Sequence, residues 1–150
     1  MDVTTASAKP PLHAVYRALY RRWGPQHWWP GRGRFEMIAG AILTQNTAWT
    51  NVEKAIANLR RARALTPLAL NGLPVARLAA LIRPAGYFNV KARRLQAFTR
   101  YLVRHHGGSL DRLFRPPTAE VRHTLLSLHG IGPETADSIL LYAANRPVFV

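Results

Sequence analysis

The chain has 150 residues, 48% of them hydrophobic, which suffices for one packed domain, or for one domain and part of a second. It carries 21 Lys and Arg against 7 Asp and Glu, a net charge of +14. This excess favours a polyanionic partner such as a nucleic acid, although an arginine-rich proteome would produce it as well. The absence of cysteine excludes disulfides and thiolate metal sites within these residues, and no apolar run approaches the ~18 residues of a membrane span.

The N-terminal residues 1–11 are polar and lack the apolar stretch of a signal peptide. We expect them to form a disordered tail, and residues 12–150 to form one domain of a soluble cytoplasmic protein. The hydrophobic periodicity is helical nearly everywhere, so the predicted fold class is all-α. Strand signals are absent apart from Val148 to Val150.

The predicted helices can be placed from their apolar faces and their end signals. Helices are predicted over residues 12–23, 35–44, 51–65, 74–82, 90–106, 109–114 (one turn), from 118 onward, and 133–145. Residues 35–44 are almost entirely apolar, which predicts the buried centre of the domain. We expect Asn89 to cap the helix of residues 90–106, Pro74 to be the first residue of its helix, and Leu95, Phe98 and Leu102 to be buried.

The segment between the last two helices is the most informative part of the chain. Gly130, Ile131 and Gly132 separate two apolar patterns, and small Ala136 stands where two helices would pack closely. The glycines allow the backbone to approach a ligand, and the next helix would direct free N–H groups at a DNA phosphate. A lone Gly-x-Gly is more typical of an ordinary capped hairpin. The full pattern in a strongly basic chain favours a helix-hairpin-helix motif that binds DNA.

Three segments carry a resemblance to a known family. Residues 128–136 (LHGIGPETA) resemble the hairpin of the endonuclease III superfamily of DNA glycosylases, which is named for its helix-hairpin-helix and its Gly/Pro-rich loop ending in aspartate. Residues 42–47 (ILTQNT) are similar to its first core helix and the following loop, and residues 86–92 (GYFNVKA) to its Gly-aromatic-Asn-x-Lys-Ala segment. The likeness extends from about residue 12 to residue 150. It implies a six-helix barrel core and a monomeric base-excision repair enzyme that acts on damaged double-stranded DNA, with no membrane partner.

The resemblance also implies roles for single residues. An enzyme that extrudes a base must fill the hole that the base leaves. Gln45 is expected to fill it and Tyr87 to intercalate opposite the lesion, although alone they would be interpreted as a polar helix end and a core aromatic residue. The residues expected to contact the DNA backbone are Gly130, Ile131, Gly132, Thr135 and Lys91. Lys91, Arg93 and Arg94 could equally form a solvated basic face.

Tryptophan residues suggest a base pocket. The Trp-Trp-Pro of residues 28–30, with Trp49 after the Gln-Asn-Thr loop, resembles the type III 3-methyladenine DNA glycosylase branch. By this resemblance Trp28, Pro30 and Trp49 line the pocket, where a cationic alkylated purine would gain roughly 1–2 kcal/mol by stacking. Chemistry alone favours a hydrophobic plug instead.

Glu134 bears on the reaction type. Bifunctional members of the family carry at this position a lysine whose amine forms a Schiff base with the sugar. A carboxylate cannot form an imine, so we expect hydrolysis by water without strand cleavage. The carboxylate that such hydrolysis needs is, by the resemblance, an Asp beyond Val150, because Asp137 lies inside the hairpin helix and Asp111 and Glu120 match no motif. No catalytic residue is therefore expected among the 150 residues, and no base release by them alone.

No metal or cofactor is expected within these residues, which contain no cysteine. Because many family members carry a Cys₄ iron–sulfur site near their C-terminus, the resemblance leaves a 4Fe-4S cluster beyond Val150 open. Two other functions remain open. The first is a bifunctional endonuclease III with apurinic or apyrimidinic site lyase activity on oxidised pyrimidines, against which Glu134 argues. The second is a non-catalytic helix-hairpin-helix module, which leaves the tryptophans and Gln45 unexplained. The sequence does not identify the lesion.

Overall fold

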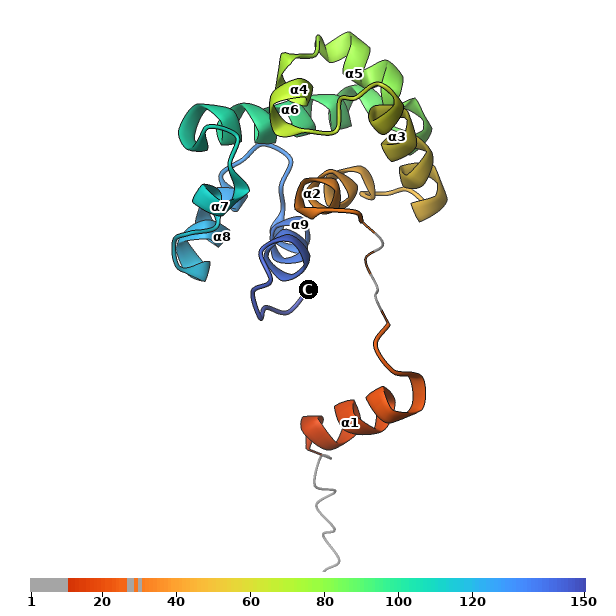
Figure 1. Cartoon of the computed structure of the whole chain (residues 1–150), viewed down its shortest axis with the longest axis vertical. Coiled ribbons are helices and arrows are strands. Elements are labelled where there is room, and N and C mark those ends of the chain that lie inside the picture. Colours follow the sequence, from red (N-terminus) through yellow and green to blue (C-terminus); the bar gives the residue numbers. More distant parts are fainter. Residues whose placement is uncertain (1–10, 27–28, 30) are drawn as a thin grey trace, which may run out of the picture. The chain divides into compact units, whose positions relative to one another are not determined.

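A computed structural model describes residues 11–26, 29 and 31–150 (Figure 1). The chain divides into two compact units, Met1–Pro30 and Gly31–Val150. The predicted disordered tail lies, apart from Pro11, outside the described residues.

The described residues form helices and no strands, which confirms the all-α class and leaves Val148 to Val150 without a strand. The helices are α1 (Leu12–Trp23), α2 (Arg34–Leu43), α3 (Trp49–Arg61), α4 (Pro67–Gly72), α5 (Val75–Leu81), α6 (Phe88–His106), α7 (Leu110–Leu113), α8 (Thr118–Leu126) and α9 (Pro133–Ser138), with a 3₁₀ turn η1 (Arg83–Ala85) and a π-helical segment η2 (Ile139–Ala143). None of these helices is long and apolar enough to cross a membrane.

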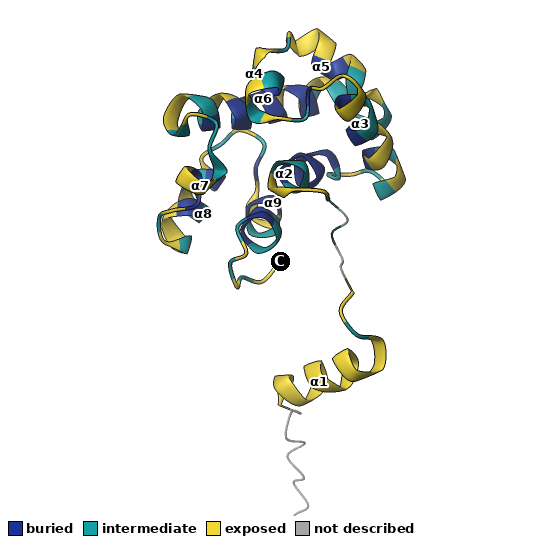
Figure 2. Ribbon diagram, viewed as in Figure 1, coloured by how far each residue is buried: buried dark blue, intermediate teal, exposed yellow. Residues whose placement is uncertain are grey.

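Helix α2 is the centre of the second unit, as its apolar sequence predicts. All six residues from Ile38 to Leu43 are buried. Helix α2 contacts α3 and α6 on the one hand and α9 and η2, near the end of the chain, on the other. Figure 2 shows buried stretches, in dark blue, along α2, α6 and α9. A helix enclosed in this way holds the residues that follow it, beginning with Thr44, at a defined place.

Helix α6 forms a long wall of this core, and the predicted burial of Leu95, Phe98 and Leu102 is confirmed. The prediction that Asn89 caps it is wrong. The helix begins at Phe88, and the cap position belongs to Tyr87, whose backbone is left-handed with φ 42°. Pro74 likewise lies one residue before α5 rather than inside it.

Two other segments differ from the sequence-based expectation. Helix α4 was not predicted, because its six residues are too few to show a helical period, although Thr66 and Pro67 are typical of a helix start. The Thr66 hydroxyl accepts a hydrogen bond of 3.2 Å from the backbone N–H of Ala69. The last predicted helix is α-helical only to Ser138 and continues as η2, a wider turn of a kind often found near functional sites.

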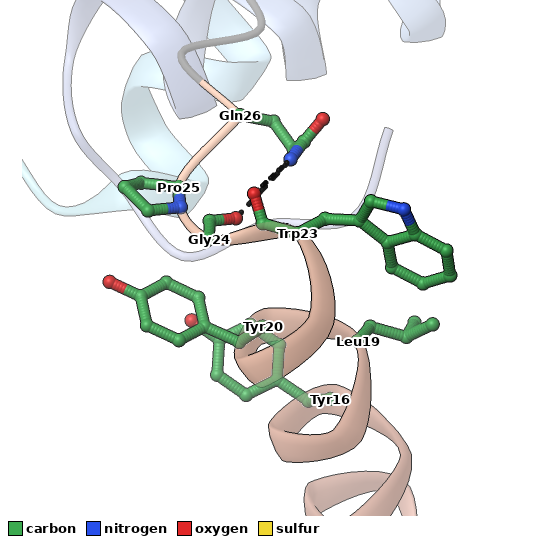
Figure 3. A pocket seen from close by; sticks show the side chains of 7 residues that line it. All are labelled: Tyr16, Leu19, Tyr20, Trp23, Gly24, Pro25 and Gln26. Carbon is green, nitrogen blue, oxygen red and sulfur yellow. Dashed lines mark hydrogen bonds between the residues drawn. The ribbon is translucent and has the colours of Figure 1, made fainter.

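The first unit contains α1, which confirms the helix predicted over residues 12–23. The side-chain amide of Gln26 donates hydrogen bonds of 3.1 and 3.3 Å to the carbonyls of Trp23 and Gly24, which closes the end of the helix (Figure 3). Apolar and aromatic side chains line a pocket of ≈ 690 Å³ there. The lining residues are Tyr16, Leu19, Tyr20, Trp23, Gly24, Pro25 and Gln26.

Candidate nucleic-acid interface

The predicted hairpin is present between α8 and α9. Ile131 is buried and anchors the turn, and Ala136 is buried where the helices pack. Gly130 has φ +85°, and a Cβ built on it would overlap the side chain of Arg94, so the turn needs glycine there. Gly132 is exposed, and a Cβ on it would meet nothing within 4 Å. The backbone at Gly132 is therefore open to a ligand, while the backbone at Gly130 packs against the protein.

An ion pair joins the two hairpin helices. Arg122 of α8 donates two hydrogen bonds, of 2.7 and 2.9 Å, to the carboxylate of Asp137 in α9. The hydrogen bonds from Arg122 lower the pKa of Asp137 below its ordinary value. The carboxylate of Asp137 is thus occupied in holding the hairpin, in keeping with the expectation that it is not the catalytic group.

Gln45 lies directly against this hairpin. It follows α2 by two residues and is half-buried. Its side-chain N–H₂ donates to the backbone carbonyl of Gly130 at 3.2 Å and to the hydroxyl of Thr135 at 2.9 Å, and its oxygen accepts a hydrogen bond from Nη1 of Arg94. Two separate sequence motifs predicted that Gln45, Gly130 and Thr135 lie at the DNA. The structure brings these three residues together.

Thr135 and Arg94 take places that the sequence did not reveal. The Thr135 side chain is buried, and its hydroxyl is bound to Gln45 rather than directed at solvent. Arg94 is half-buried on α6, between Gln45 and the hairpin turn. From the sequence, Arg94 is expected only as part of a basic helix face. Arg94 lies three residues after Lys91, which places both on one side of the helix, and this spacing was the sequence signal for where Arg94 lies.

Lys91 does not lie where its sequence motif predicts. Its side chain is 1% exposed, and its amine donates hydrogen bonds to the carbonyl of Leu43 at 2.8 Å and to that of Ala85 at 2.7 Å. Burial, followed by the nearby charge of Arg94, lowers the pKa of Lys91. An enclosed amine offers no surface to a phosphate, so the prediction that Lys91 contacts the DNA backbone is corrected. The hydrophobic periodicity of the helix does not predict this burial, because a lysine on an amphipathic helix ordinarily faces solvent.

Tyr87 is the opposite case, because 72% of its surface is exposed and it is not a core aromatic residue. Its left-handed backbone, with φ 42°, is uncommon for a bulky residue. The turn is held by the Tyr87 carbonyl, which accepts hydrogen bonds of 3.0 Å from the backbone N–H groups of Val90 and Lys91. An exposed ring on a well-held turn is the geometry that an intercalating residue needs. Its insertion into DNA remains a prediction.

Of the predicted base pocket, Trp28 and Pro30 lie outside the described residues. Trp49 is the first residue of α3 and is half-buried, and its indole N–H donates to Glu53 at 3.2 Å. Trp49 lies four residues after Gln45 along the chain. The pocket as a set of three residues therefore stays a prediction.

Three further carboxylates lie in α7, α8 and α9. Glu134 is the exposed second residue of α9, in the first turn, where the helix dipole favours a negative charge. Asp111 of α7 is paired with Arg34 at 2.5 Å, and Glu120 is exposed in the first turn of α8. Across the described ranges, His, Cys, Asp and Glu side chains form no group of three or more that could hold a metal ion.

Comparison with known proteins identifies the family. Residues 39–149 match the model of the HhH-GPD superfamily of base excision DNA repair proteins. The chain belongs to this superfamily. HhH-GPD denotes the helix-hairpin-helix and the Gly/Pro-rich loop with its aspartate, so the family resemblance predicted from three short segments is confirmed.

Relatives in this superfamily share much of the chain. The chain is 44% identical to the Putative DNA repair glycosylase MJ1434 of Methanocaldococcus jannaschii over 140 residues. This alignment covers 93% of this chain and 64% of that protein. Over 113 residues it is 31% identical to Endonuclease III of Thermotoga maritima, with 75% of this chain and 49% of the relative covered.

Solved structures agree with this fold. The chain is similar to the Helicobacter pylori 3-methyladenine DNA glycosylase MagIII bound to 1,N6-ethenoadenine, with a TM-score of 0.78 and 32% identity over 93% of this chain and 66% of that one. A non-covalent Endonuclease III–DNA complex matches with a TM-score of 0.72 and 22% identity over 92% of this chain and 61% of the other, which supports the fold alone. The chain spans between 49% and 66% of the length of these four relatives.

Proposed function

We propose that the chain is the DNA-binding part of a monofunctional base-excision repair glycosylase, in which water rather than an enzyme amine attacks the sugar. Glu134 carries this proposal. It is an exposed carboxylate at the position that the family resemblance assigns to the Schiff-base lysine. In the described part of the chain the lysines are Lys54, on α3, and Lys91, whose amine is enclosed by two carbonyls. No amine of the described hairpin replaces the missing one.

In the proposed complex the hairpin binds a phosphate and the wedge residues, Gln45 and Tyr87, enter the duplex. The open backbone at Gly132 and the N–H groups of the first turn of α9 are suited to a phosphate oxygen. The net charge of +14 adds a general attraction to DNA that falls with salt. Flipping a base costs a few kcal/mol of stacking and pairing, which Gln45 offsets by occupying the space left behind and Tyr87 by intercalating opposite the lesion.

The reaction breaks the bond between C1′ of the deoxyribose and the base nitrogen. Water supplies the oxygen that bonds to C1′ and loses a proton to solvent, and the base leaves with the electrons of the broken bond, so that a cationic alkylated purine leaves as a neutral base. We do not assign the carboxylate that stabilises the cationic sugar to Asp137 or Asp111, because arginines already bind both.

We propose an alkylated purine as the substrate class. The H. pylori protein to which the chain is similar is a 3-methyladenine glycosylase by its name. Half-buried Trp49 supports the same class, because a cationic purine is attracted to the face of an indole more strongly than a neutral pyrimidine. Release of 3-methyladenine from methylated duplex DNA by the intact protein, against a duplex that contains an oxidised pyrimidine, measures this preference.

Borohydride trapping tests the reaction type. The intact protein should release a base and leave no covalent adduct with DNA after reduction, whereas Glu134→Lys should restore an amine there and give a trapped adduct. An adduct with the unsubstituted protein contradicts the monofunctional proposal. DNA binding without base release from any lesion favours a non-catalytic module.

A further inference from the structure

Two turns of the fold carry the two residues expected to enter the duplex. Gln45 follows the end of α2, and Tyr87 follows η1. They come from segments more than 40 residues apart in the sequence, and no strand or disulfide joins them in the described structure. Gln45 can fill the gap of the flipped base while Tyr87 intercalates opposite the lesion only if the distance between their two turns is fixed.

Lys91 bonds to both turns. Its amine donates to the carbonyl of Leu43, two residues before Gln45, and to the carbonyl of Ala85, two residues before Tyr87. The distances are 2.8 and 2.7 Å, and the amine lies with its side chain 1% exposed. One buried atom is thus hydrogen-bonded to the end of α2 and to the end of η1 at the same time.

The chemistry of this arrangement favours a rigid link. The last carbonyls of a helix carry a partial negative charge and lack partners within the helix, so a buried ammonium at that place is compensated. A buried charge is nevertheless costly, and apolar side chains of similar volume often serve stability as well or better. What a lysine adds here is a defined geometry, because its hydrogen bonds hold the two carbonyls close to one amine.

We propose that Lys91 is a positioning residue, which holds the turns of Gln45 and Tyr87 at the separation that the damaged duplex requires. This inference rests on the proposed function, since the wedge roles belong to it. Lys91 touches neither DNA nor the reacting atoms in this proposal. It acts through the two carbonyls.

Gln96 provides a matched control on the same helix. It is also buried, and its side-chain amide donates to a backbone carbonyl, that of Leu73, at 2.5 Å. Leu73 lies between α4 and α5, outside both wedge turns. Lys91→Met and Gln96→Met therefore each remove one buried polar link from α6, but only the first link reaches Gln45 and Tyr87.

Hydrogen–deuterium exchange of the free protein tests the link without DNA. Lys91→Met should increase the exchange of amides in residues 44–48 and 84–88 together, and Gln96→Met should increase it near residue 73 instead. Lys91→Leu, which also lacks a donor group, replaces Lys91→Met if the latter does not fold. An unchanged exchange rate in either wedge turn overturns the proposal.

Binding then tests the consequence for DNA, with duplexes that differ only in one abasic-site analogue. Lys91→Met should lose about tenfold of the preference for the abasic duplex, with unchanged affinity for the intact one, since small misplacements of a binding group are costly. Gln96→Met should keep the preference. Loosened turns with an undiminished preference overturn the positioning role. A wild-type protein without any preference overturns the proposed function instead, and the exchange experiment still decides whether Lys91 holds the turns.

Discussion

The side-chain amide of Gln45 donates a hydrogen bond of 2.9 Å to the hydroxyl of Thr135, a residue 90 positions further along the chain. A second bond from the same amide reaches the carbonyl of Gly130. The free protein therefore keeps the expected wedge folded onto the hairpin. In the proposed role of Gln45, entry into a duplex would exchange these bonds for bonds to bases, which would make the net cost of the exchange small.

Substitutions at the two ends of this bond separate a DNA-inserting role of Gln45 from a purely structural one. Gln45→Ala should lower the preference for a duplex with an abasic-site analogue about tenfold, because a gap in the base stack stays empty. Thr135→Val removes the same hydrogen bond but keeps the glutamine, and should change the preference by less than about twofold. Fluorescence anisotropy with paired duplexes measures both. Equal losses in the two variants would show that Gln45 acts only as a link to the hairpin.

Tyr87 allows stability and DNA recognition to be tested separately. Its left-handed backbone strains any residue with a Cβ, so Tyr87→Gly should be about 1 kcal/mol more stable than Tyr87→Ala. Both variants lack the ring and should lose the same share of the preference for abasic DNA. Urea denaturation gives the first quantity and anisotropy the second. A preference retained by either variant would remove Tyr87 from the wedge.

Local patterns in the sequence predicted much of this structure. The apolar run of α2 predicted its burial, and the two glycines around Ile131 predicted the hairpin. Each of these signals is contained within a single short segment of the sequence. The same holds for the buried face of α6. The family resemblance rested on such segments and on their order along the chain.

Contacts between segments could not be predicted in this way. The amine of Lys91 reaches carbonyls 48 and 6 residues away, and a lysine on an amphipathic helix is ordinarily solvated. The bonds of Gln45 to the hairpin depend on how α2 packs against α9, which periodicity does not encode. The left-handed turn at Tyr87 was missed because asparagine is the better capping residue and Asn89 was close by.

The two hairpin glycines should respond differently to alanine. Gly130→Ala places a Cβ against the Arg94 side chain in a left-handed conformation, and should lower the free energy of unfolding by about 1–2 kcal/mol or more. Gly132→Ala adds a Cβ to open space at φ −91°, and should change stability by less than about 0.5 kcal/mol. Thermal unfolding of the two variants tests this order. A Gly130→Ala protein as stable as the wild type would contradict the packing of Arg94 against the turn.

The ion pair between Arg122 and Asp137 makes hairpin stability depend on pH. The pKa of Asp137 is lowered in the folded chain, so the pair's contribution is complete above the unfolded value of 3.8 and is lost as the pH falls through the lower folded value. At pH 7, Asp137→Asn should lower the free energy of unfolding by about 1 kcal/mol, at the upper end of the range for partly exposed pairs. The reason is that two hydrogen bonds hold a carboxylate that is only 15% exposed.

The difference in unfolding free energy between wild type and Asp137→Asn should therefore be constant from pH 7 to about pH 5 and shrink below 3.8, as urea denaturation at a series of pH values can measure. Asp111→Asn is the control, since Asp111 makes a single ion pair with Arg34 and its side chain is 87% exposed. At pH 7 this control should cost less than about 0.5 kcal/mol, because solvent screens an exposed pair. A loss for Asp137→Asn that grows as the pH falls would be opposite in sign to the effect of a lowered pKa, and would contradict the assignment of this pair as the link between α8 and α9.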